Sequence, residues 1–118
     1  MATVQRVAEK KRCYFYMNES FFYINDIPTF IGIPQGTPHA AIIFCHGFGG
    51  SKSEKCRHFV RLSKKLRENR FLTVRFDFTG FGDSPKDSKE FSISQGVNDI
   101  KNIISYVNNE YHQKKQVF

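Results

Sequence analysis

The run Ala40-Ala-Ile-Ile-Phe-Cys-His-Gly-Phe-Gly-Gly-Ser-Lys52 decides how this chain folds. Its first six residues are apolar without alternation, which is typical of a strand buried on both faces of a parallel sheet. His46 and the glycines after it end the strand, and an amphipathic stretch follows. A strand, a glycine-rich loop and a helix in this order predict an α/β sheet.

The helix predicted after the glycine loop carries signals at both ends. Ser51 and Glu54 stand three residues apart, which is the spacing of a capping box. Asn69 is placed to end the helix in the left-handed conformation. The predicted inward stripe consists of Cys56, Phe59, Val60, Ser63 and Leu66, with Leu62 at its edge.

Short aromatic-rich runs precede the glycine loop. Cys13–Met17 and Phe21–Ile24 flank Asn18-Glu-Ser20 and predict a β-hairpin. Thr29–Ile33 predicts a further strand, bracketed by prolines. Residues 1–12 are interpreted as a polar lead-in, so the predicted domain spans residues 13–118.

The segment after the first helix repeats the strand, loop and helix order. Phe71–Phe76 predicts a strand, and a second helix begins near Ser92 or Ser94. Gln116-Val-Phe118 begins a further apolar segment. The predicted apolar face of the second helix consists of Val97, Ile100, Ile103, Ile104, Val107 and Tyr111. The fold class is therefore α/β, an antiparallel N-terminal meander followed by parallel strands with helices.

Composition limits the classes of partner. The 118 residues allow one domain, and 13 Phe favour a packed interior over disorder. The net charge is +7, but the basic residues are scattered and no RNA-binding or zinc-finger motif is present, so no nucleic acid partner is predicted. Three cysteines without framework spacing predict reduced thiols and a cytoplasmic protein. We expect no membrane partner, because no signal peptide or apolar run of spanning length is visible.

A glycine loop between a strand and a helix favours anions, because free N–H groups and the helix dipole point toward it. A phosphate-binding P-loop needs Gly-x-x-x-x-Gly-Lys-Ser, and here His46 and Ser51 replace both glycines. A dinucleotide-binding Gly-x-Gly-x-x-Gly is matched at its first two glycines but has Lys52 at the third. Asp77 would then be the acid that binds ribose, and this alternative stays open.

A third chemistry for this loop is an oxyanion hole, where preset N–H groups stabilise a carbonyl oxygen by about 3–4 kcal/mol per donor. His46-Gly47-Phe48-Gly49-Gly50 resembles the His-Gly-x loop of the α/β-hydrolases. The resemblance implies that the backbone N–H of Phe48 is the donor and that its ring lines the acyl pocket. It also implies that His46 and Gly47 hold the corner, with Gly49 and Gly50 supporting the loop.

A second motif supports the same resemblance. Arg75-Phe-Asp-Phe-Thr-Gly-Phe-Gly-Asp-Ser84 resembles the loop after the fourth strand of that family. The resemblance implies that Asp77, Gly80, Gly82 and Ser84 shape this loop and take no part in chemistry. The likeness covers about residues 20–118. It is greatest to the serine-aminopeptidase-like and the cinnamoyl or feruloyl esterase-like members.

The Gly-x-Ser-x-Gly nucleophile elbow of that family does not occur in this sequence. The nearest run, Ser92-Ile-Ser-Gln-Gly96, lacks the first glycine and follows a polar loop, so it predicts a helix cap. His112 follows in a lysine-rich segment and, like His39 and His58, is predicted to lie on the surface. No cysteine and histidine spacing fits a metal, so no metal site is predicted.

The resemblance therefore implies the N-terminal half of an α/β-hydrolase sheet, truncated before the nucleophile elbow. The parent reaction would be hydrolysis of a small-molecule carboxylic ester by a serine hydrolase without a cofactor. We expect this chain alone to be inactive. Alternatives are a dinucleotide-binding module, a non-enzymatic binding module or one chain of a split hydrolase. The unfinished sheet edge predicts pairing with a complementary chain or self-association.

Overall fold

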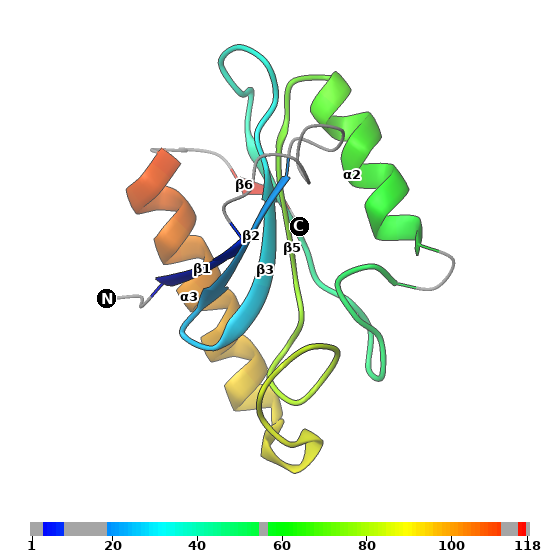
Figure 1. Cartoon of the computed structure of the whole chain (residues 1–118), viewed down its shortest axis with the longest axis vertical. Coiled ribbons are helices and arrows are strands. Elements are labelled where there is room, and N and C mark those ends of the chain that lie inside the picture. Colours follow the sequence, from blue (N-terminus) through cyan, green and yellow to red (C-terminus); the bar gives the residue numbers. More distant parts are fainter. Residues whose placement is uncertain (1–3, 9–18, 55–56, 112–115, 118) are drawn as a thin grey trace.

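The computed structural model describes residues 4–8, 19–54, 57–111 and 116–117. They form one mixed sheet with the strand order β1-β2-β3-β5-β4-β6. Figure 1 shows the two long helices on opposite sides of this sheet. The strands are β1 (Val4–Ala8), β2 (Glu19–Ile24), β3 (Ile27–Gly32), β4 (Ala41–Phe44), β5 (Leu72–Phe76) and β6 (Gln116–Val117). The helices are α2 (His58–Glu68), the 3-10 helix η2 (Ser88–Glu90) and α3 (Ile93–Tyr111).

The strand directions confirm the predicted fold class. The strands β1, β2, β3 and β5 pair antiparallel in that order, whereas β4 pairs parallel with both β5 and β6. The antiparallel part therefore comes first in the chain and the parallel part follows, as the sequence predicted. The carboxyl ends of β4 and β5 lie at the same edge of the sheet, so the loops that follow these two strands are neighbours.

The N-terminal region differs from its prediction in three places. The lead-in predicted for residues 1–12 contains β1, and β2 begins at Glu19, inside the expected hairpin turn. The actual turn is Asn25-Asp26, where both residues have positive φ, as a two-residue hairpin turn of type I′ requires. Pro28 lies inside β3, where its carbonyl accepts a hydrogen bond from the Asp77 N–H at 3.0 Å. The other predicted hairpin strand, Cys13–Met17, lies outside the described residues.

Helix α2 begins later than the sequence predicted. The capping box is wrong, because the Glu54 carboxylate accepts from the Gly47 N–H at 3.1 Å and Glu54 itself has a φ of 56°. The helix starts at His58 without a side-chain cap. At the other end Asn69 is the C-cap with a negative φ, and Arg70 takes the left-handed conformation instead.

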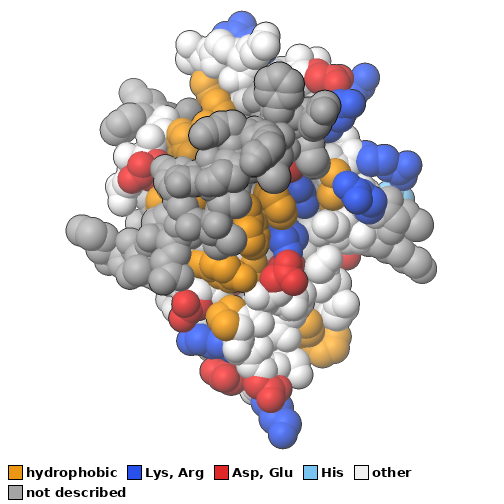
Figure 2. Space-filling view, viewed as in Figure 1, with side chains coloured by type: hydrophobic (Ala, Val, Ile, Leu, Met, Phe, Trp, Pro, Cys, Tyr) orange, Lys and Arg blue, Asp and Glu red, His pale blue; other side chains and the backbone are white. Residues whose placement is uncertain are grey.

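The core lies between the sheet and α3. Ile24, Ile43, Val74 and Phe76 are fully buried in the strands, and Ile103 from α3 packs on them. On the face shown in Figure 2, hydrophobic side chains gather over the middle of the molecule and charged ones lie mostly toward the rim. Within the described residues, no helix combines the length and apolar character that crossing a membrane requires.

Helix α3 is turned slightly from its predicted orientation. Ser92 caps it, because its Oγ accepts from the Gln95 N–H at 3.1 Å. Ile103 and Val107 are buried as predicted, but Val97 is 48% exposed. Asp99 is buried in its place, because Thr79 on the loop after β5 gives this carboxylate hydrogen-bond donors.

Two isoleucines of α3 test the position of the core. Ile103→Ala should lower the free energy of unfolding by about 2–5 kcal/mol, because the deletion leaves a cavity under the sheet. Ile93 is 78% exposed on the same helix, so Ile93→Ala should change it by less than about 0.5 kcal/mol. Urea titration followed by circular dichroism measures both values, and equal losses would contradict the described packing.

Candidate active site

Two loops meet at the carboxyl edge of the sheet, one after β4 and one after β5. His46 joins them, because its Nε2 accepts a hydrogen bond from the Phe78 N–H at 3.0 Å. A backbone N–H can only donate, so Nε2 carries no proton and Nδ1 carries the proton of the neutral ring. Nδ1 lies 2.8 Å from the Gly47 carbonyl oxygen and donates to it. Both ring nitrogens of this buried histidine are therefore occupied in holding the glycine loop.

The glycine loop leaves the Phe48 amide at its tip. The Gly50 N–H donates to the Gly47 carbonyl at 2.9 Å, and the Gly47 N–H is taken by Glu54. No residue of the described part of the chain accepts a hydrogen bond from the Phe48 N–H. Gly49 has a φ of 80°, which glycine adopts without strain. The N–H groups of Gly49 and Ser51 likewise have no acceptor in the described part of the chain, so the loop presents several backbone donors, with that of Phe48 beside an aromatic pocket.

An apolar pocket of about 220 Å³ lies next to this donor. The Phe48 side chain is 89% exposed, and its ring contacts the Phe81 ring edge-on with 5.3 Å between centroids. Phe81 in turn contacts His46 and Phe91 in the same geometry. The pocket is lined by His46, Gly47, Phe48, Phe78, Phe81, Phe91 and Ile93. Aromatic rings therefore form one wall beside the free amide, and this wall suits an apolar group.

The buried Asp77 carboxylate holds the glycine loop and the loop after β5 together from the interior of the protein. This carboxylate is fully buried and accepts from the Lys52 backbone N–H at 2.6 Å, the Lys52 ammonium at 2.8 Å and the Asp83 N–H at 2.8 Å. The ammonium of Lys52 also lies 2.6 Å from the exposed carboxylate of Asp83. One acid therefore fixes the end of the glycine loop and the turn after β5 at the same time.

Two glycines shape the turn after β5. Gly82 has a φ of 55°, and a Cβ at this position would overlap the Asp77 carboxylate. Gly80 has a φ of 91°, and a Cβ there would meet the Asp87 carbonyl oxygen at 2.9 Å. The Ser84 hydroxyl accepts from the Gly80 N–H at 3.0 Å and closes the turn. Gly80, Gly82 and the Ser84 hydroxyl thus contact other parts of the same loop. They are among the residues to which the resemblance to the α/β-hydrolases assigned the shaping of this loop.

A buried ion cluster continues from Lys52 into the sheet. Arg75 donates to the Lys52 carbonyl at 3.1 Å and grips the Glu19 carboxylate with two nitrogens, at 2.7 and 3.1 Å. Arg67 from α2 donates to the same carboxylate at 3.1 Å and to Thr73. Burial lowers the pKa of Arg67, and the charge of Glu19 opposes this effect. The buried arginines thus share Glu19 and connect α2 to the glycine loop.

The remaining candidates lie apart from this arrangement. Ser92 is the N-cap of α3, and His39 and His58 are exposed, as predicted. His112 lies outside the described residues. Burial raises the pKa of the Cys45 thiol, which disfavours the thiolate. Within the described residues, no group of three or more histidine, cysteine or acidic side chains could hold a metal ion.

The arrangement of Asp77 argues against the dinucleotide-binding alternative. A ribose-binding acid must present its carboxylate to the ligand, whereas Asp77 has no exposed surface and already accepts three hydrogen bonds. Lys52, which stands where the third glycine belongs, fills the adjoining space with its buried side chain. Asp77 is therefore not available to bind a ribose in this arrangement.

The sheet order and the two loops define an α/β-hydrolase fold. The model of the family described as serine aminopeptidase, S33, matches residues 36–118, more than half of the chain. This chain therefore belongs to the serine aminopeptidase S33 family. It is also 31% identical over 75 residues to an uncharacterized 31.7 kDa protein of the traX-finO intergenic region of Escherichia coli, and the match covers 63% of this chain and 25% of that protein.

Solved structures share the fold at low sequence identity. Est1E of Butyrivibrio proteoclasticus with bound ferulic acid matches at a TM-score of 0.68 and 22% identity, over 76% of this chain and 36% of that one. A lidless serine hydrolase of Xanthomonas campestris matches at 0.65 and 15% identity, over 85% and 49%. A serine hydrolase homologue of Coxiella burnetii matches at 0.54 and 24% identity, over 76% and 43%. This chain thus spans less than half the length of these relatives.

A pair of glycine variants tests the role of Asp77 in shaping the loops. Gly36 and Gly82 both have positive φ, but a Cβ at Gly36 meets nothing closer than 3.6 Å. Gly36→Ala should therefore cost about 1 kcal/mol from backbone strain alone. Gly82→Ala should cost at least about 2 kcal/mol more, since it displaces a buried, hydrogen-bonded charge. Chemical denaturation gives both values, and equal costs would show that Asp77 yields freely.

A second pair of variants tests the buried ion cluster. Glu19→Gln should lower the free energy of unfolding by about 3–5 kcal/mol, because it leaves the buried charges of Arg67 and Arg75 uncompensated. The exposed pair Lys65–Glu68, with 3.8 Å between charged atoms, is the control. Glu68→Gln should cost less than about 1 kcal/mol. Urea titration separates the two, and a Glu19→Gln variant of native stability would contradict the cluster.

Proposed function

We propose that this chain supplies the oxyanion-binding part of a serine hydrolase that cleaves carboxylic esters. The observation that carries the proposal is the Phe48 N–H, which has no acceptor in the described part of the chain and lies beside an aromatic pocket. Membership of the S33 family supports a serine hydrolase, and the likeness of the fold to a thermostable carboxyl esterase of Bacillus coagulans supports an ester as the substrate. The activity of a complete enzyme is part of the proposal, because these residues cover only a fraction of their relatives.

In the proposed reaction a serine attacks the ester carbonyl and the carbonyl oxygen gains negative charge. The Phe48 N–H donates to this oxygen, and the residue after the nucleophile donates the second hydrogen bond. A histidine takes the serine proton and passes it to the leaving alcohol. The nucleophilic serine and this histidine come from polypeptide beyond the present 118 residues, since the sequence holds no Gly-x-Ser-x-Gly. His46 cannot replace that histidine, because both of its nitrogens are engaged.

The aromatic pocket receives the acyl part of the ester in this proposal. Its wall of Phe48, Phe81 and Phe91 offers ring edges and faces, which pack well against a flat aromatic or a short apolar acyl chain. The ferulic acid bound to Est1E is a flat aromatic acid of this kind. The Phe48 ring is exposed at the mouth of the pocket, where an incoming acyl group would cover it.

The isolated chain provides the first test. Residues 1–118 should not accelerate p-nitrophenyl acetate hydrolysis above the background rate, because the oxyanion donor has no nucleophile to act with. The assay follows release of p-nitrophenol at neutral pH. Turnover that a serine-directed phosphonate abolishes would overturn this expectation.

The oxyanion donor is tested in the longest protein encoded in frame with these residues, with a nucleophile elbow present. Phe48→Pro removes both the N–H and the ring, so it should share the KM of Phe48→Ala and, relative to that variant, lower kcat by about 10²–10³-fold. Phe48→Ala keeps the N–H and should act mainly on KM. Steady-state kinetics on p-nitrophenyl esters measures both, and a proline variant with native kcat would refute the role of this amide.

A further inference from the structure

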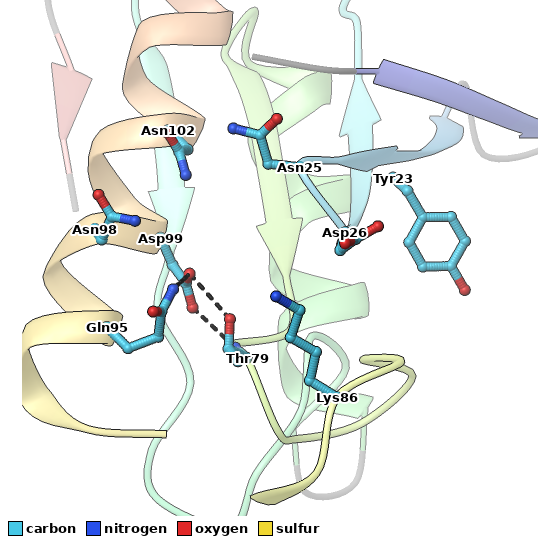
Figure 3. A pocket seen from close by; sticks show the side chains of 9 residues that line it. All are labelled: Tyr23, Asn25, Asp26, Thr79, Lys86, Gln95, Asn98, Asp99 and Asn102. Carbon is cyan, nitrogen blue, oxygen red and sulfur yellow. Dashed lines mark hydrogen bonds between the residues drawn. The ribbon is translucent and has the colours of Figure 1, made fainter. Parts of the chain in front are cut away.

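A second cavity, of about 470 Å³, shares no lining residue with the aromatic pocket. It lies between α3, the β2–β3 hairpin and the loop after β5 (Figure 3). Every side chain that lines it is polar, and none of them takes part in the proposed reaction. The lining residues are Tyr23, Asn25, Asp26, Thr79, Lys86, Gln95, Asn98, Asp99 and Asn102.

Hydrogen bonds fix the side chains in the inner part of the cavity before any ligand binds. Asp99 is 1% exposed and accepts from the Thr79 N–H at 2.8 Å, the Thr79 hydroxyl at 3.0 Å and the Gln95 amide at 2.8 Å. These contacts hold the Gln95 amide in one orientation at the wall of the cavity, as Figure 3 shows. The first polar group that a ligand meets there is therefore fixed before binding, which lowers the entropic cost of recognition.

The two walls face each other across the opening. Asn98 and Asn102 stand one helical turn apart on α3, and the left-handed turn Asn25-Asp26 carries the opposite wall. The Lys86 side chain extends between them from the loop after β5 (Figure 3). Carboxamides dominate this surface, and each of them carries donors and an acceptor on one rigid plane.

The charges exclude two ligand classes. Asp26, Asp99 and Lys86 together give the lining a net charge of about −1, so an anion such as phosphate is disfavoured. A divalent cation is disfavoured as well, because the Asp99 oxygens already accept three hydrogen bonds and no metal-binding cluster occurs among the described residues. A neutral molecule that both donates and accepts many hydrogen bonds matches the mixed donors and acceptors of this lining.

We propose that this cavity binds a neutral polyhydroxylated ligand, namely a sugar, either free or as the end of a longer glycan. Each hydroxyl of a sugar donates and accepts at once, which matches a lining of carboxamides with a carboxylate and an ammonium. The volume lies within the range of about 300–1,000 Å³ that is common for small-molecule sites. The site is separate from the aromatic pocket, so it stands or falls independently of ester hydrolysis.

The test uses the purified protein that carries these residues and saturation-transfer difference NMR. The probes are the methyl glycosides of glucose, galactose and xylose, with inorganic phosphate as the anionic comparison. At least one glycoside should receive saturation from the protein and phosphate should not compete with it. Equal affinity of a monosaccharide and its trisaccharide indicates a free sugar, and tighter binding of the trisaccharide indicates a glycan end.

Helix variants assign the signal to the cavity. The double change Asn98→Ala and Asn102→Ala should weaken binding about tenfold through two lost hydrogen bonds, while alanine keeps the helix stable. Lys86→Gln, at an exposed position, should weaken it about fivefold. Asn109→Ala is the control, because Asn109 is exposed on the same helix and does not line the cavity.

The proposal is overturned by any of three results. These are no saturation transfer to any glycoside, competition by phosphate at equal concentration, or a double variant that binds as the native chain does. Circular dichroism of each variant verifies that α3 is intact, and the exposed Lys86→Gln variant decides the matter if the double variant loses its helix.

Discussion

The three hydrogen bonds to the Asp77 carboxylate fix the positions of both loops at the sheet edge. Each is charge-assisted, and the two from Lys52 are buried, so each contributes about 1.5–3 kcal/mol. Lys52 neutralises the acid, and its own carbonyl is held by Arg75, which leads to Glu19 and α2. The Phe48 amide can keep its place at the surface because the end of its loop is fastened in the interior. The exposed Phe48 donor thus depends on a mostly buried network, whose charges balance once the exposed Asp83 carboxylate is included.

Local patterns in the sequence were sufficient to predict an α/β sheet that is antiparallel at its start and parallel afterwards, but not the strand β1. The apolar run at residues 40–45 and the two loop motifs each carry their signal within a few neighbouring residues, and the mixed sheet confirms them. The capping box at Glu54 failed for a physical reason. Its carboxylate has two competing donors, the start of a helix and the Gly47 N–H, and the sequence shows only the first. The fold decides which donor lies within reach.

The buried ions and the polar cavity were not predictable from periodicity. An amphipathic pattern places charged residues outside, yet Arg67 and Glu19 are buried because they meet across a sequence separation of 48 residues. Asp99 likewise replaced Val97 on the inner side of α3, because Thr79 supplies its donors from another segment. The sequence signal for the buried ions is the presence of arginine, threonine and glutamate within strands that are otherwise apolar. A pattern that spans only neighbouring residues cannot reveal contacts between residues that lie far apart in the chain.

Within the described residues, every hydrogen bond that holds the glycine loop or its ion cluster joins two residues between Glu19 and Asp83. A ribosome delivers this stretch before any residue that follows it, and folding can begin during synthesis. The glycine loop can therefore fold while the chain is still growing. Segments that are synthesised later would then pack against a loop that has already folded, and the loop would not need to rearrange around them.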